Sequence, residues 1–197
     1  SPMSRGLGDV YKRQALGLEK AGFQSLLLNE IDSDACETLK KNRVEWNVEN
    51  CDVKEYDFTR FKNKVDLLTG GFPCQAFSYA GKKLGFNDTR GTLFYEFARA
   101  VKETNPKVIL AENVKGLVSH NSGKTLETIK DIIDEIGYEL VEPETLKAIF
   151  YKVPQKRERI FLVAIRKDLS RFVNFKYPAK YLSLIHISET TRHRRIS

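Results

Sequence analysis

Residues 65–75 read VDLLTGGFPCQ and place a short apolar run directly before a glycine-containing segment. The run predicts a buried strand, because it is too short for a helix and ends at glycine. A second apolar run, KVILA at residues 107–111, is followed by Glu112 and Asn113 in the same way. Both polar segments therefore leave the carboxyl ends of predicted strands, which is where ligands bind in open α/β sheets.

Outward from these two runs, strand and helix patterns alternate along residues 15–181. Strands are expected at residues 25–29, 48–53, 65–69, 107–111, 138–150 and 159–166, and helices at residues 15–22, 34–42, 92–104 and 123–136. This alternation predicts an α/β fold with a doubly wound, mostly parallel sheet. Only VPQKRE, residues 153–158, joins the last two strands, so the final strand is expected to be antiparallel.

The composition is that of a globular protein, with 197 residues, 41% hydrophobic and 30% charged. It excludes intrinsic disorder, collagen and coiled coils for most of the chain. No apolar run approaches the roughly 20 residues that a membrane helix needs, so no membrane association is expected. The cysteines Cys36, Cys51 and Cys74 lack CxxC spacing, which argues against a metal site or a disulfide framework and favours the cytoplasm.

The two ends of the chain are related at the DNA level. One DNA string can encode DVYKRQ, residues 9–14, and its reverse complement can encode LSLIHI, residues 182–187. The string resembles a transposase end sequence used in sequencing libraries. Residues 1–14 and 182–197 are therefore expected to be translated adapter, with natural tails as the alternative. Each end contributes +2 to the net charge of +7, so the overall charge is weak evidence for a nucleic-acid partner.

Cys74 and Glu112 are candidate reactive groups on the two polar segments. Pro73 stiffens the entry to the first segment and would hold the Cys74 thiol at the mouth of the crevice. A thiolate is a strong nucleophile beside cations, although a lone cysteine is more often buried and inert. The Glu112 carboxylate suits proton donation if it faces the crevice, and otherwise it is an ordinary loop glutamate.

The segment QKRER, residues 155–159, would enter the same crevice from an antiparallel final strand. In an extended segment, Gln155, Arg157 and Arg159 point one way, and Lys156 and Glu158 point the other. Two aligned guanidinium groups would place fixed cations there, suited to a carbonyl or phosphate oxygen. The alternative is a solvated charge run beside an edge strand.

Four motifs together resemble the DNA cytosine C5-methyltransferase family of bacterial modification enzymes. They are GFPCQAFS at residues 71–78, RGTLF at 90–94, ENV at 112–114 and QKRERI at 155–160. Their order and spacing carry the resemblance, which covers about residues 15–181. The resemblance implies transfer of a methyl group from S-adenosylmethionine to C5 of cytosine.

The resemblance also implies a role for each candidate residue. Cys74 would attack C6 of a cytosine flipped out of double-stranded DNA, forming a covalent intermediate. Glu112 would hydrogen-bond the base at N3 and at the exocyclic amine. Arg159 would bind the cytosine O2, and Arg157 would help to position the catalytic loop. The implied DNA contacts are Gln75, Ser78, Lys82, Lys83 and Arg90.

The cofactor residues implied by the resemblance lie mainly at the ends of the first two predicted strands. Glu30 matches the acid that holds the ribose hydroxyl groups of S-adenosylmethionine, which also agrees with the rule for doubly wound sheets. Ile31 would pack on the adenine, and Asp52 and Val53 would meet its edge. Pro73 and Leu93 would line the pocket, while Asn113 and Gln155 are expected to be structural.

The chain also departs from the family pattern. The first strand with its glycine-rich turn should precede Ala15, and a target-recognition domain should follow residue 181, but neither is expected in this sequence. The activity is therefore assigned to a parent protein, a monomer, and the 197-residue chain itself is expected to be inactive. A restriction endonuclease could accompany the parent. The alternatives are a methyltransferase that acts on transfer RNA and a non-catalytic nucleic-acid-binding remnant.

Overall fold

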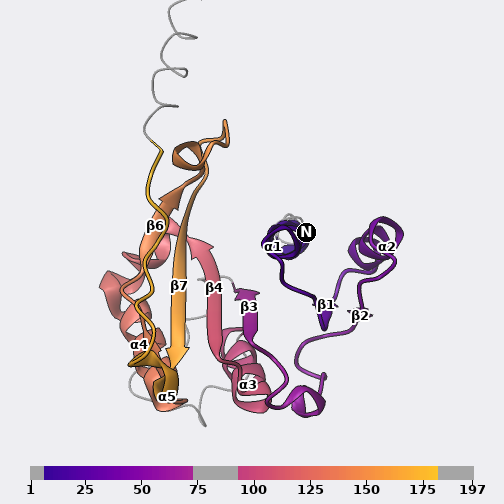
Figure 1. Cartoon of the computed structure of the whole chain (residues 1–197), viewed down its shortest axis with the longest axis horizontal. Coiled ribbons are helices and arrows are strands. Elements are labelled where there is room, and N and C mark those ends of the chain that lie inside the picture. The colour runs from indigo at the N-terminus through magenta and orange to yellow at the C-terminus, as the bar shows by residue number, and fades with distance from the viewer. Residues whose placement is uncertain (1–6, 73–92, 182–197) are drawn as a thin grey trace, which may run out of the picture.

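A computed structural model of the chain describes residues 7–72 and 93–181, and Figure 1 shows its mixed α/β architecture. The described helices of eight residues or more are α1 (Leu7–Lys20), α2 (Ser33–Asn42), α3 (Leu93–Thr104) and α4 (Lys124–Glu135). The short helices are η1 (Thr59–Phe61), η3 (Lys115–Leu117), η4 (His120–Gly123), η5 (Ala148–Tyr151) and α5 (Lys167–Ser170). The strands are β1 (Leu28–Glu30), β2 (Val48–Asn50), β3 (Leu67–Gly71), β4 (Val108–Val114), β5 (Tyr138–Leu140), β6 (Glu144–Lys147) and β7 (Glu158–Arg166).

The described strands form two separate sheets. β1 and β2 pair in parallel, and the second sheet has the order β3-β4-β7-β5, with β6 also paired to β7. β3 is parallel to β4, whereas β7 is antiparallel to β4, as the sequence predicts for the final strand. In Figure 1 the β1–β2 pair lies apart from β3, with α1 near the top of the space between them. β1 and β3 each have one edge without a strand partner among the described residues.

One hydrophobic core joins the larger sheet to α3 and α4. Alternate residues of β4 and β7 enter it, including Ile109 and Ile160, because side chains on one face of a strand recur every second residue. Phe94 and Val101 of α3 and Ile129 of α4 pack there with less than 2% of their surface exposed. A separate small cluster of Cys36, Leu39 and Val48 holds α2 against β1 and β2.

Gly70 brings the end of β3 close to α3. A Cβ atom at this position would lie 2.6 Å from two carbon atoms of the Phe97 ring, which is too close for any side chain. The absence of a side chain therefore lets the first glycine of the GGFPCQ segment pack directly against the helix. This contact places the chain that leaves β3 beside the β4 edge.

Five of the six predicted strands need correction. The strand expected at residues 48–53 is Val48–Asn50, and the one expected at residues 65–69 is Leu67–Gly71. The strand expected at residues 138–150 is divided into β5 and β6, because Pro143 between them lacks an amide donor, and residues 148–151 form η5 instead. The strand expected at residues 25–29 is confined to Leu28–Glu30. β4 continues to Val114, so Glu112 and Asn113 lie on a strand that pairs with β7, and not in a loop.

Local features mark the ends of two helices, of which the one expected at residues 15–22 is the end of α1, Leu7–Lys20. Asp32 is the cap of α2, since its Oδ1 accepts a hydrogen bond from the Ala35 amide at 2.8 Å. The first helix ends before Gly22, whose φ of 90° is the left-handed conformation that glycine adopts easily. Among the described residues, no helix is both long enough and apolar enough to cross a membrane.

Candidate active site

The three predicted polar segments meet at one edge of the larger sheet. Gly71 at the end of β3 is in register with Glu112 of β4, and Val114 of β4 is in register with Arg159 of β7. Because β7 is antiparallel, its beginning lies beside the ends of β3 and β4. The convergence expected from the sequence is therefore confirmed for the described parts of these segments.

Glu112 is the buried centre of this edge, with 7% of its surface exposed. Its Oε1 lies 2.8 Å from Arg159 Nε and 3.4 Å from Arg157 Nη2. A carboxylate removed from water needs charged or hydrogen-bonded partners, and the two guanidinium groups provide them. The carboxylate is thus fixed in orientation.

Asn113 fixes the neighbouring backbone. Its Nδ2 donates a 2.7 Å hydrogen bond to the Phe72 carbonyl, and its Oδ1 accepts from the Val114 amide at 2.8 Å. Only 4% of the surface of Asn113 is exposed. Asn113 therefore ties the exit of β3 to β4, which agrees with its expected structural role.

Alternate residues at the start of β7 point to opposite sides, as the extended segment predicts. Arg157 and Arg159 face Glu112, whereas Glu158 lies 2.7 Å from Lys147 Nζ and 3.0 Å from Lys115 Nζ. Hydrogen bonds from Lys147 and then Lys115 hold the pKa of Glu158 below its usual range. Gln155, expected on the side of the arginines, is exposed.

A cavity of about 280 Å³ opens beside Glu112. Its lining residues are Gln14, Glu112, Leu146, Ala148, Tyr151, Arg157, Arg159 and Phe161. The volume lies at the small end of the roughly 300–1,000 Å³ typical of ligand pockets, so the cavity suits a single ring system. Polar groups come from Gln14, Glu112, Arg157 and Arg159, and aromatic or aliphatic side chains form much of the rest.

Gln14 is a cavity residue that the sequence did not indicate. Both its Nε2 and Oε1 atoms are buried and have no hydrogen-bond partner among the described residues. An unpaired buried amide costs free energy, so this wall of the cavity favours a ligand that both donates and accepts. The sequence carried no signal for it, because Gln14 lies in the segment interpreted as adapter.

The residues expected to hold a cofactor lie mainly on the smaller sheet. Glu30 is the last residue of β1, and only 7% of its surface is exposed. Its carboxylate accepts a hydrogen bond from the Asp32 amide at 3.0 Å. Ile31, directly after it, is 66% exposed. Asp52 and Val53 follow β2, which is parallel to β1, so both segments leave the same edge of this sheet. Leu93 lies on α3 and packs against the larger core.

Part of the expected site lies outside the described residues. These residues are Pro73, Cys74, Gln75, Ser78, Lys82, Lys83 and Arg90. Of the described cysteines, Cys36 is 2% exposed and its thiol hydrogen-bonds the Glu30 carbonyl at 3.4 Å. Burial raises the pKa of Cys36, which disfavours the thiolate form in which a thiol reacts. Cys51 lies 3.1 Å from Asn29 Nδ2.

Comparison with known proteins relates this chain to one family. The family model of the C-5 cytosine-specific DNA methylase matches residues 11–195. The Type II methyltransferase M.Eco47II of Escherichia coli is 64% identical over 178 residues, which are 90% of this chain and 43% of that protein. The Type II methyltransferase M.HhaI of Haemophilus parahaemolyticus is 42% identical over 84% of this chain and 49% of that protein.

A solved structure shows the same kind of fold. A variant of Spodoptera frugiperda DNMT2 has a TM-score of 0.63 and 26% identity, and the match covers 83% of this chain and 49% of that one. The present chain thus spans less than half the length of these two curated relatives.

Proposed function

Since the chain belongs to the C-5 cytosine-specific DNA methylase family, we propose that the whole protein methylates C5 of cytosine in DNA. The proposed methyl donor is S-adenosylmethionine. The observation that carries the proposal is the buried Glu112 carboxylate, held by Arg157 and Arg159 beside a cavity of about 280 Å³. An acceptor and two fixed cations next to a small cavity suit the polar edge of one pyrimidine. The flipped cytosine would enter here, because its reacting atoms are inaccessible inside a duplex.

Each residue of the site has a defined task in this proposal. The Cys74 thiolate adds to C6 of the base, while Glu112 hydrogen-bonds N3 and the exocyclic amine, and Arg159 holds O2. The new S–C6 bond makes C5 nucleophilic, and C5 takes the methyl group while S-adenosylhomocysteine would leave. Loss of the C5 proton to water then breaks the S–C6 bond and restores the thiolate. Arg157 positions the loop that carries Cys74.

The described residues fit the methyl donor. Glu30 is a buried acid at the end of β1, which suits ribose hydroxyl groups, and the exposed Ile31 side chain beside it offers an apolar surface for a flat ring. Asp52 and Val53 would meet the edge of the adenine, and Pro73 and Leu93 would complete the pocket. When bound, S-adenosylmethionine supplies an electrophilic methyl group.

For the 197-residue chain by itself we propose no methyl transfer and at most weak binding of S-adenosylmethionine. The residues proposed to bind the methyl donor lie at the ends of β1 and β2, whereas the proposed reacting groups lie at the ends of β3 and β4. Among the described residues, these two pairs of strands are not joined by strand pairing. Gln14 also lies in the wall of the base cavity. A sharp melting transition together with micromolar binding of S-adenosylmethionine in calorimetry would contradict this proposal.

The proposed nucleophile is tested by trapping on DNA that contains 5-fluorocytosine, with the whole protein. Fluorine at C5 prevents the final elimination, so a covalent complex is expected to persist in denaturing gels. Cys74→Ala is expected to abolish the complex, while Cys36→Ala and Cys51→Ala retain it. The assignment is wrong if the Cys74→Ala protein still traps DNA.

Substrate and partner follow from the family and remain part of the proposal. Double-stranded DNA is the proposed substrate, because the Type II relatives favour DNA over transfer RNA. The same relatives favour a restriction endonuclease as a companion of the whole protein. A monomer is proposed, since one chain carries all the assigned groups. The target sequence can be measured by methylation of a random DNA library, in which a fixed sequence context around the modified cytosine is expected.

A further inference from the structure

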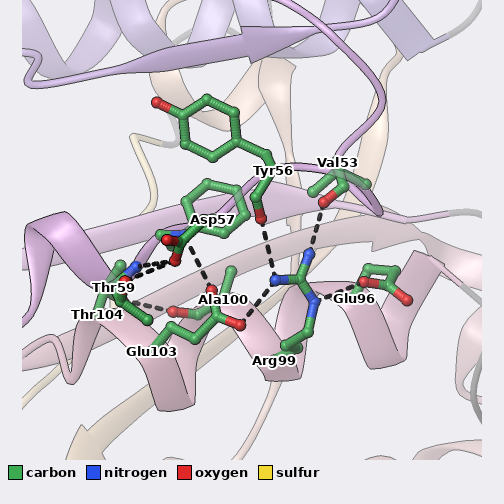
Figure 2. Close-up of polar contacts among 10 residues, drawn as sticks. Val53, Tyr56, Asp57, Thr59, Glu96, Arg99, Ala100, Glu103 and Thr104 are labelled. Atoms are coloured by element: carbon green, nitrogen blue, oxygen red, sulfur yellow. Dashed lines mark hydrogen bonds and ion pairs between the residues drawn. The ribbon is translucent and has the colours of Figure 1, made fainter.

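Arg99 of α3 reaches across to the segment that follows β2. Its Nη2 donates to the Val53 carbonyl at 2.6 Å and its Nη1 donates to the Tyr56 carbonyl at 3.0 Å. Figure 2 shows the guanidinium group between the helix and this segment. One side chain thus holds two carbonyl groups that lie three residues apart in the chain.

Two acids of the same helix complete the network. Arg99 Nε lies 2.8 Å from Glu96 and Arg99 Nη1 lies 2.8 Å from Glu103, whose other oxygen accepts from the Phe58 amide at 2.9 Å. The Arg99 guanidinium also lies over the Phe58 ring, 5.6 Å from its centroid. Burial opposes the charge of Arg99, but the hydrogen bonds that Arg99 donates to Glu96 and Glu103 outweigh it and raise its pKa. Arg99 is therefore a permanent cation in which each of the three nitrogen atoms donates to an acceptor.

The segment held in this way contains two consecutive turns. The Glu55 amide donates to the Asp52 carbonyl at 3.0 Å, and the Tyr56 amide donates to the Val53 carbonyl at 3.4 Å. The Asp52 side chain accepts from the Lys54 amide at 3.0 Å. Arg99 binds the carbonyls at both ends of the second turn, so its removal would free the residues that the turn displays.

The network also connects the two sheets. Residues 51–58 continue from β2, whereas α3 packs in the core that contains β4 and β7. Strand pairing does not join the sheets in the described part of the chain, so contacts such as those of Arg99 help to set their relative position. A rigid, planar cation is suited to this task, because its N–H groups have fixed directions.

We propose that Arg99 is a positioning residue for the methyl donor: it holds Asp52 and Val53 in the arrangement that meets the adenine edge. This inference rests on the proposed use of S-adenosylmethionine at Glu30, Asp52 and Val53. Arg99 itself does not contact the donor. It acts through the Val53 and Tyr56 carbonyls, with Glu103 as its partner at the Phe58 amide.

Hydrogen exchange of the 197-residue chain tests the structural step. Arg99→Gln is expected to speed exchange of the Phe58 amide by about tenfold, with β4 and β7 unchanged. In Arg99→Lys the exchange rate of the Phe58 amide should lie between those of the unaltered chain and Arg99→Gln, because one ammonium group cannot reach all the acceptors. The matched control is Arg166→Gln, since Arg166 likewise binds a carboxylate, Asp168, and a backbone carbonyl, that of Asn105, at another site. Unchanged exchange in Arg99→Gln would overturn the proposal.

Titration of the whole protein with S-adenosylhomocysteine, followed by the amide NMR signals of Asp52 and Val53, tests the functional step. Arg99→Gln is expected to raise the dissociation constant about tenfold, Arg99→Lys is expected to raise it less, and Arg166→Gln is expected to leave it unchanged. A dissociation constant that Arg99→Gln leaves unchanged would overturn the role of Arg99 alone. If the unaltered whole protein shows no response at Asp52 and Val53, the proposed cofactor site itself is contradicted.

Discussion

At the scale of single residues, Glu112 shows how a buried carboxylate is stabilised at the sheet edge. One buried carboxylate meets two arginines, at 2.8 Å and 3.4 Å, and all three groups border the same cavity. The buried carboxylate is stable only with cations beside it, because an isolated buried charge is costly. The same groups line the cavity, where a base could use their polar atoms.

Replacing Glu112 by glutamine is expected to lower methyl transfer by the whole protein by ~10²-fold or more, because the amide cannot donate a proton to the base. Binding of S-adenosylmethionine should change little, since Glu112 faces the base cavity. Single-turnover rates measure the first effect, and calorimetry measures the second.

The matched control for this change is Glu158→Gln. Glu158 lies on β7 among the same charged residues, but it pairs with Lys115 and Lys147 on the opposite side. Its replacement should leave the transfer rate nearly unchanged. Near-normal turnover of the Glu112→Gln enzyme would return Glu112 to a structural role.

Tyr138 allows a prediction about pH and stability. It is 2% exposed, its hydroxyl donates to the Pro106 carbonyl at 2.7 Å, and burial raises its pKa to about 12. Since the unfolded value is about 10, the folded state favours the neutral phenol. This contribution is complete below pH 10 and is lost as the pH rises toward 12, on the order of 2 kcal/mol in total.

The Tyr138→Phe variant separates this effect from the titration of lysines. At pH 7 it should lower the free energy of unfolding by about 1 kcal/mol, through loss of the hydrogen bond to Pro106. Between pH 10 and pH 12 the difference between the two proteins should shrink and then reverse, because only the tyrosine titrates. Urea unfolding at several pH values measures it, and a difference independent of pH would contradict the assignment.

At the scale of elements, α2 begins where two polar contacts coincide. Asp32 accepts from the Ala35 amide, and its own amide donates to the buried Glu30 carboxylate. The first turn of the helix is therefore coupled to the end of β1, where the ribose of the donor is proposed to bind. A change in the cap should affect both the first turn of α2 and the proposed ribose site at the end of β1.

Asp32→Ala should destabilise the β1–α2–β2 unit by about 1 kcal/mol, because the first turn loses its side-chain acceptor. Asp32→Asn, which keeps an acceptor oxygen, should cost less. Hydrogen exchange of the amides in α2 measures the effect. Equal exchange in the alanine variant and the unaltered chain would show that the cap contributes nothing.

At the scale of the whole molecule, the separation of the two sheets implies unequal stability. The larger sheet shares a core with α3 and α4, whereas β1 and β2 depend on a small cluster around Cys36, Leu39 and Val48. Regions with little buried apolar surface open at lower free energy than the main core. The two parts of the molecule should therefore open independently.

Native-state hydrogen exchange is expected to show this directly. Amides of β1, α2 and β2 should exchange faster than those of β4 and β7, and low concentrations of urea should increase the difference. Uniform exchange free energies across both sheets would contradict the prediction and indicate one cooperative unit.

The sequence by itself determined the order of elements and the chemistry of the candidate site. Apolar runs and the alternation in QKRER are local patterns, so they predicted the order of the strands along the chain and the side of β7 on which Arg157 and Arg159 lie. The family motifs followed from the same short segments. The division near Pro143 had a local signal, because proline cannot donate to a sheet.

Only the tertiary structure decided which distant groups meet. The contact of Arg157 with Glu112 spans 45 residues and that of Arg99 with Val53 spans 46, and the extension of β4 to Val114 depends on pairing with β7. Gln14 in the cavity wall and the separation of the sheets have no local pattern at all. Such features result from strand register and helix packing, which sum many weak contacts across the chain and are not recorded in any one segment.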